Sequence, residues 1–506
     1  MAVSSGGGVT NVWLARPRCR GWARGLSGAP RPALIPRIRV VAGPCSPVRT
    51  PAVPGIPFPL RRAARRVAAC GPVLRPGAGA TGVSAGPVET SPSSGFGWFL
   101  CGQALSGFGD RFTAFTAQSV AILVLGASST QLGVLSATGW LAYPVLGMVA
   151  GAVLARVRLK RAMIAGELVR FAAFAGVAVT VTAGQVSVTQ LLIVVAVAGA
   201  ATVFVDISGQ SLVPSLVGRG RLLSANSRLS GADSMTKLAG PALAGVLFGL
   251  AGPGWAAALA AVPFLLSAAA RLPIRVAEER PGHRRDPPGA LLGGMRQGVV
   301  FVWRHPLLRP LVCRSALRGF GTGAVDAVLL LFAYRGLGLS STQGGLLMAA
   351  GSVGALAGAV LATRIIGRLG MRRSLLLTGL EGALWLAVPL CAVAEPLVVL
   401  LLIRLLSAVW LPVWGVLDAG LRQTLAPPGR QSTVHAVTRT LSFSAIPLGA
   451  VAAGFTGDAL AARLGTPAGL GMVLAAGGLV AASGVLMLRK EALLDDRQVT
   501  ALSVRR

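Results

Sequence analysis

The sequence is poor in charged residues, in histidine and in paired cysteines. Only 13% of its 506 residues are Asp, Glu, Lys or Arg, whereas soluble globular proteins have about a quarter. The six cysteines form no C-x-x-C pair, and the three histidines show no metal-ligand spacing. We therefore expect no metal, no cofactor and no disulfide framework. None of the three lysines follows a glycine, which excludes the G-K-[ST] motif of an ATP-driven pump. No nucleophile–base arrangement appears either, so an enzyme is not expected.

Apolar and basic residues are present in excess. Hydrophobic residues make up 53% of the chain, and 48 basic against 16 acidic residues give a net charge of +32. A nucleic-acid-binding protein can carry such a charge, but that class does not need so apolar a body. The composition therefore predicts an integral membrane protein, and the preference for Arg, Ala and Gly indicates a GC-rich bacterial gene.

Residues 1–95 differ in composition from the rest of the chain. They are rich in Pro, Gly, Ala and Arg, carry Glu89 as their one acidic residue, and contain no apolar run long enough to cross a membrane. Such a segment buries too little apolar surface to fold, so we expect a disordered extension. Two interpretations remain open: a basic tail that contacts anionic lipid, or a start codon assigned too far upstream.

Beyond residue 95, apolar runs of roughly 18–28 residues alternate with short polar breaks, which is the length that spans a ~30 Å hydrocarbon core. Twelve helices are predicted, over residues 97–125, 131–155, 162–183, 189–215, 229–250, 254–272, 311–334, 342–366, 373–393, 396–420, 432–457 and 467–488. They form an amino-terminal six-helix bundle (96–272) and a carboxy-terminal one (311–488), joined by a linker loop (273–310) and followed by a tail (489–506).

The distribution of arginine and lysine over the predicted loops is one-sided. The loops on one face, with the tail, carry 26 basic residues, whereas those on the other face carry only Arg335 and Arg463. Because basic loops stay in the cytoplasm, both termini are expected there. This topology also explains the basic excess, so no nucleic-acid partner is expected.

The two halves of the chain resemble each other. The segment ALSGFGD at 104–110 returns as ALRGFGT at 316–322, 212 residues later, and AGAVLA at 150–155 recurs unchanged at 357–362. Two six-helix repeats predict a two-fold transporter whose substrate path lies between the halves.

Several motifs point to one family. They are GQALSGFGDR at 102–111, LVPSL at 212–216, ANSRL at 225–229 leading into AGPALAG at 239–245, and FVWRHP at 301–306. Together they resemble the Major Facilitator Superfamily, and within it the twelve-helix drug:proton antiporters, which include multidrug, macrolide and siderophore exporters. The resemblance implies an all-α integral membrane fold. It also implies that Gly240, Pro241 and Gly245 bend the fifth helix and pack it against its partner.

The loop after the second predicted helix departs from the family pattern. The superfamily usually has an aspartate there, which holds the outward-facing state, whereas this chain has Ala155 followed by Arg156. A non-transporting sensor of the same fold therefore stays open as an interpretation.

Carboxylates are scarce inside the predicted spans. An ionised group at the bilayer centre costs roughly 3 kcal/mol, so it usually faces a partner or a wet cavity. In a proton-coupled exporter, a proton and a cationic substrate compete for one such negative charge. The acidic residues within the spans are Asp110, Glu167, Asp206, Asp233, Asp326, Glu381 and Asp418.

Four residues are candidates for the substrate and proton path. Asp110 comes first, near the middle of the first predicted helix, with Arg111 beside it. Because adjacent residues do not share a helix face, Arg111 is not automatically its partner. Asp326 has no counterpart in the repeat, and Glu381 lies deep in the ninth predicted helix.

Other charges are expected to act in gating or in holding the fold. The i,i+3 spacing pairs Glu167 with Arg170, and the i,i+4 spacing pairs Asp233 with Lys237. The remaining members of this group are Arg156 in the loop and the repeat-related Asp206 and Asp418, near the cytoplasmic ends of the fourth and tenth predicted helices.

The sequence thus predicts a secondary active transporter of a bacterial plasma membrane that exports hydrophobic or cationic small molecules in exchange for protons. A siderophore exporter or a small-molecule importer of the same fold is the alternative. The expected partners are the small-molecule substrate, protons and membrane lipid, and a monomer is expected.

Overall fold

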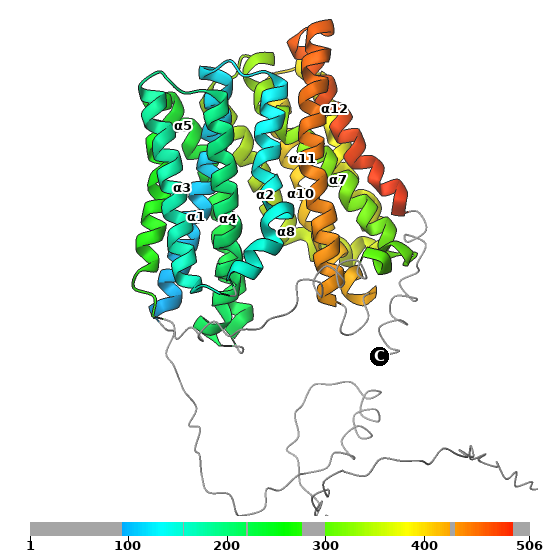
Figure 1. The fold of residues 1–506 in the computed structure, drawn as a ribbon. Helices are drawn as coiled ribbons and strands as arrows, with labels where there is room; N and C mark the ends of the chain where they lie inside the picture. The colour runs from blue at the N-terminus through cyan, green and yellow to red at the C-terminus, as the bar shows by residue number, and fades with distance from the viewer. Residues whose placement is uncertain (1–93, 155, 219–220, 276–298, 426–430, 489–506) are drawn as a thin grey trace, which may run out of the picture. The chain divides into compact units, whose positions relative to one another are not determined.

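The computed structural model describes residues 94–154, 156–218, 221–275, 299–425 and 431–488. The predicted amino-terminal extension, most of the predicted linker and the tail therefore lie outside the described residues, apart from residues 94 and 95 of the extension. Within the described ranges the chain is helical and contains no strand (Figure 1).

Within each part of the chain, before and after the stretch between Arg271 and Leu308, the helices follow one another with short connections, as expected for neighbouring antiparallel spans. The first part of the chain contains α1 (Ser94–Ser119), continued by the π-helix η2 (Val120–Val124), α2 (Ser129–Leu154), α3 (Leu159–Thr182), α4 (Val188–Val217) and α5 (Leu222–Arg271). The second part contains α7 (Leu308–Leu331), continued by the π-helix η4 (Phe332–Gly336), α8 (Ser341–Leu377), α9 (Leu380–Ala383), the 3₁₀ helix η5 (Leu384–Ala392), α10 (Pro396–Leu425), α11 (Gln431–Leu464), α12 (Thr466–Ser483) and the 3₁₀ helix η6 (Gly484–Leu488).

Glycine divides two of these long helices. Gly252 in α5 has φ 81° and Gly370 in α8 has φ 75°. An α-helix cannot continue through this left-handed backbone, which glycine adopts without steric penalty. The two divisions fall at breaks between predicted spans. Some boundaries were wrong. For example, α5 begins at Leu222 rather than at residue 229, and α11 ends at Leu464 rather than at residue 457, because polar residues beyond the apolar runs continue the helices.

Eight helices of the described chain are long and apolar enough to cross a membrane. Their outer faces carry large apolar side chains that water would not favour. Val179, Leu250 and Val360, for example, are 66%, 83% and 59% exposed. So large an apolar surface is expected where hydrocarbon surrounds the protein.

The helices form two groups, α1–α5 and α7–α12, which meet mainly through two helix pairs (Figure 1). α2 packs against α11, and α5 packs against α8. A cluster of buried apolar side chains runs through both groups and includes Val120 of η2 and Leu329 of α7.

The contact between α5 and α8 depends on small residues. A Cβ atom on Gly245 would lie 2.7 Å from the carbonyl oxygen of Ser341 and 2.8 Å from Cα of Gly345, so the two backbones touch. Close approach of this kind lets helices pack tightly in lipid. Gly240 of the same segment lies against α1 instead, where a Cβ atom would meet Cβ of Arg111 at 2.6 Å.

The contact between α2 and α11 includes a shared helix cap. The carboxylate of Asp458 in α11 accepts hydrogen bonds from the backbone N–H groups of Ser129, at 2.8 Å, and Thr130, at 2.9 Å. Ser128 and Gln131 bond each other's backbone N–H groups reciprocally. The four N–H groups from Ser128 to Gln131 at the start of α2 are thereby satisfied, two of them by the other helix group.

Replacing Asp458 with alanine should lower the stability of the protein. The change removes two hydrogen bonds to a charged acceptor, and we expect a loss of about 2 kcal/mol and a lower melting temperature in detergent. Thr456→Ala is the matched control, because its exposed hydroxyl donates only within α11, to Ala452 and Ala453. Equal melting temperatures for the two variants would show that the cap does not hold the groups together.

Candidate functional site

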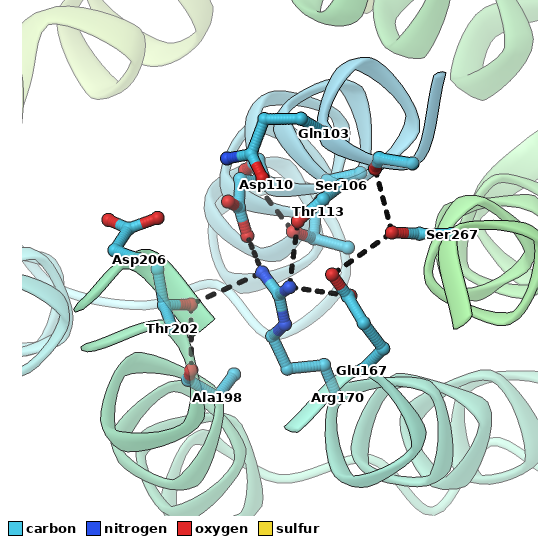
Figure 2. A network of polar contacts seen from close by, with 12 residues as sticks. Gln103, Ser106, Asp110, Thr113, Glu167, Arg170, Ala198, Thr202, Asp206 and Ser267 are labelled. Atoms are coloured by element: carbon cyan, nitrogen blue, oxygen red, sulfur yellow. Dashed lines mark hydrogen bonds and ion pairs between the residues drawn. The ribbon is translucent and has the colours of Figure 1, made fainter. Parts of the chain in front are cut away.

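A network of charged side chains lies among the helices of the first group (Figure 2). Glu167 of α3 is completely buried, and its two carboxylate oxygens lie 2.5 Å from the guanidinium groups of Arg170 and Arg271. The hydroxyl of Ser267 also donates a hydrogen bond to Glu167, at 3.0 Å. One buried carboxylate therefore holds arginines from α3 and α5 in place.

Arg170 links this buried carboxylate to Asp110 of α1. Its Nη1 lies 2.7 Å from Oδ1 of Asp110, and its Nη2 donates to the hydroxyl of Ser106 at 2.8 Å. The guanidinium also lies 4.5 Å from the ring centroid of Phe264. Two carboxylates and two guanidinium groups thus balance each other, as a buried set of charges requires.

Asp110 is the member of this set that remains accessible. Its side chain is 34% exposed, whereas those of Glu167, Arg170 and Arg271 are at most 1% exposed. Of the two carboxylates in this set, that of Asp110 is therefore partly exposed, whereas that of Glu167 is not.

Asp206 of α4 lies on the side of the network opposite Glu167, as Figure 2 shows. Its carboxylate accepts a short hydrogen bond from the hydroxyl of Tyr143 in α2. One turn before Tyr143, the ring of Trp140 stacks on the ring of Phe443 in α11, with the two ring centroids 5.8 Å apart. The guanidinium group of Arg439 lies 5.3 Å from the centroid of the Phe443 ring. Aromatic and charged groups from both helix groups therefore gather beside α4.

The second helix group carries a related ion pair with its charges exchanged. Arg318 of α7 donates two hydrogen bonds to Glu381 of α9, at 2.6 and 2.7 Å. Arg318 stands 212 residues after Ser106, at the matching position of the sequence repeat. In the α1–α3 pair, the acidic residue Asp110 thus lies on α1. In the α7–α9 pair, the acidic residue Glu381 lies on α9.

Two further acidic residues of the second group have arginine partners. Asp326 of α7 is 53% exposed and lies 3.1 Å from Arg404 of α10. Asp418 pairs with Arg422 within α10 at 2.9 Å, and Arg422 also donates to Ser315 of α7 at 3.1 Å.

The predicted site residues thus fall into separate places. Asp110, Glu167 and Arg170 come together, whereas the side chain of Arg111 lies 3.9 Å from Asp233. Asp233 also pairs with Lys237, at 2.5 Å, so the predicted i,i+4 contact is present.

Two of the predicted gating residues lie away from these pairs. Arg156 is exposed at the α2–α3 connection and joins none of the ion pairs among the described residues. Asp206 lies well before the end of α4 at Val217, so its expected place near the helix end was wrong. The predicted span, 189–215, already ended close to Val217, so the error lay in counting a residue so far from that end as near it.

Sequence reasoning missed two members of these contacts. Arg271 was counted with the basic loop, yet its side chain is 1% exposed and bonds Glu167. Its position one helix turn after Ser267 was the available signal, because residues four apart share a helix face. Asp458 was placed just beyond its predicted span, and no local pattern indicated its contact with α2.

Glu167→Gln should destabilise the protein far more than Asp110→Asn. The first change leaves two buried guanidinium groups with too little negative charge, for which we expect a loss of about 3–5 kcal/mol. The second change affects an accessible carboxylate, and Arg170 keeps its bond to Glu167. Thermal unfolding and membrane abundance of both variants measure the difference, and equal effects would contradict the central role of Glu167.

Comparison with known proteins places this architecture in a family. The sequence model of the Major Facilitator Superfamily matches residues 99–450. The chain belongs to this superfamily. The multidrug efflux pump Tap of Mycolicibacterium fortuitum is 26% identical over 345 residues, which cover 67% of this chain and 83% of the relative. The protein is thus a multi-pass transporter of the plasma membrane, as the sequence predicted, and not an enzyme.

Solved structures of superfamily members share the fold. The nucleoside transporter NupG superimposes with a TM-score of 0.63 at 11% identity, covering 78% of this chain and 99% of that chain. A bacterial homologue of the iron transporter ferroportin, in an inward-facing state, superimposes with a TM-score of 0.58 at 22% identity, covering 79% of this chain and 98% of that chain. A bacterial homologue of the human lysosomal transporter Spinster, also inward-facing, superimposes with a TM-score of 0.59 at 15% identity, covering 82% of this chain and 99% of that chain.

Proposed function

We propose that the protein exports hydrophobic or cationic small molecules in exchange for protons, with Asp110 as the carboxylate for which both compete. The observation that carries the proposal is the accessibility of Asp110 within an otherwise sealed set of charges. The similarity to the multidrug efflux pump Tap supports a drug-like substrate.

The contacts of Arg170 support proton exchange at Asp110. If Asp110 takes up a proton, Arg170 keeps its ion pair with Glu167 and its hydrogen bond to Ser106. The arginine therefore does not lose its place when the charge on Asp110 changes. A carboxylate that can be neutralised without collapse of its surroundings suits repeated cycles of protonation.

The groups around Asp206 support a cationic or flat substrate. Trp140 and Phe443 offer aromatic faces, and Asp206 adds a second negative charge held by Tyr143. Aromatic rings attract cations through their negative faces, most strongly where water is excluded. These residues come from α2, α4 and α11, so a substrate placed there would touch both helix groups.

The membrane arrangement is part of the proposal. Counting α5 and α8 as two spans each, and α9 with η5 as the end of the ninth span, supports twelve helices in two bundles, 96–272 and 311–488, around the linker 273–310. The one-sided distribution of arginine supports cytoplasmic termini. The Asp458 cap and the Gly245 contact would then close the external side, which corresponds to an inward-facing state.

Expression in a drug-sensitive bacterium that lacks its own pumps should raise tolerance to lipophilic cationic dyes, and a proton uncoupler should abolish dye efflux. Asp110→Asn should remove the tolerance without changing membrane abundance, because the charge shared by proton and substrate is lost. Glu395→Gln, an exposed carboxylate outside the network, is the control and should keep full tolerance. Unaltered tolerance in Asp110→Asn at equal abundance would remove Asp110 from the path.

A further inference from the structure

A groove of about 890 Å³ lies where the end of α2 meets α3 and α4. Its walls are mainly apolar, with Val153 of α2, Val169 of α3 and Val197 of α4 among the lining residues. These three valines are 42%, 44% and 41% exposed. Because α3 and α4 are long and apolar enough to cross a membrane, we expect valines exposed on this surface to face lipid.

One end of the groove is strongly basic. Arg156, Arg158 and Arg161 line it, all three are exposed, and no acidic residue is among the lining residues. Within the described chain, none of the three guanidinium groups forms a hydrogen bond or an ion pair. The stretch 153–161, which contains them, also has no acidic residue.

The neighbouring Lys160 differs from the three arginines, because it bonds another part of the fold. Lys160 turns away and donates to the carbonyl oxygens of Leu272, at 2.7 Å, and Ile274, at 2.8 Å, so that it ties α3 to the end of α5. The three arginines make no such bond. They leave a charge of +3 at the mouth of an apolar groove, and a bound anion would satisfy it.

The pairing of the two surfaces indicates the chemistry of the ligand. Guanidinium groups bind phosphate oxygens in strong, often bidentate hydrogen bonds. A free phosphate would make no use of the valine walls, and an uncharged apolar molecule would make no use of the arginines. An anionic phospholipid fits both, with its acyl chains along the valines and its phosphate among the arginines.

We infer that this groove binds an anionic phospholipid of the cytoplasmic leaflet through Arg156, Arg158 and Arg161. The assignment of the leaflet rests on the proposed orientation, whereas the binding itself does not depend on transport. A bound lipid would fix the α2–α3 connection to the membrane surface at the carboxyl end of α2, the helix that also contacts α11.

Native mass spectrometry of the delipidated, full-length protein tests the inference with phosphatidylglycerol and phosphatidylcholine as probes. We expect one phosphatidylglycerol to be retained in preference to phosphatidylcholine. The triple variant Arg156→Gln, Arg158→Gln, Arg161→Gln should lose that retention by about tenfold or more. The control triple variant Arg364→Gln, Arg368→Gln, Arg372→Gln removes as many exposed charges from α8 and should retain the lipid.

Two further arms separate the groove from other sources of binding. Ala165→Trp fills the groove and leaves the arginines in place, so it should also reduce lipid retention. Inorganic phosphate at millimolar concentration should not displace the lipid. Equal loss in both triple variants, undiminished binding by Ala165→Trp, or displacement by phosphate would each overturn the inference. None of these outcomes depends on drug export, so the proposed function is tested separately.

Discussion

The burial of one carboxylate between two guanidinium groups is the constraint on which the rest of the site depends. Glu167 has no exposed surface and bonds Arg170 and Arg271 from two helices. Removing either kind of charge leaves the other unpaired in a medium that cannot solvate it. Because Arg170 is fixed in this way, it offers a stationary positive charge to Asp110. Asp110 is therefore the partly exposed carboxylate of the same network that stabilises the helix group.

The two helix groups contain related ion pairs that differ in exposure and in which helix carries the acidic residue. The α1–α3 pair joins Asp110 to Arg170, whereas the α7–α9 pair joins Arg318 to Glu381 with both residues largely shielded. In the second group the more accessible acid is Asp326, on a different turn of α7 and paired with α10. The two ion pairs have their charges exchanged between the helices and start from neighbouring, not matching, positions of the repeat, so the two-fold fold has an asymmetric interior. Asp110 and Asp326 therefore lie on different turns of α1 and α7 and have different arginine partners.

How much of this was predictable follows from the range of each interaction. The membrane spans were predictable because lipid demands long apolar helices, and the Glu167–Arg170 and Asp233–Lys237 pairs because helix geometry brings such spacings together. The bond between Asp110 and Arg170 joins residues 60 positions apart, and the bond between Asp458 and α2 joins residues more than 300 apart. Those partners are chosen by helix packing, which no local pattern encodes. Arg271 was misjudged because a charge at the end of an apolar run usually lies in a loop.

We propose that Asp110 exchanges a proton for substrate. The most direct test is the release of protons when a lipophilic cationic dye binds to the purified protein in weakly buffered detergent, followed with a pH indicator. We expect the wild-type protein to release protons on binding, and Asp110→Asn to bind dye more weakly and to release none. Proton release by Asp110→Asn equal to that of the wild-type protein would contradict the proposal.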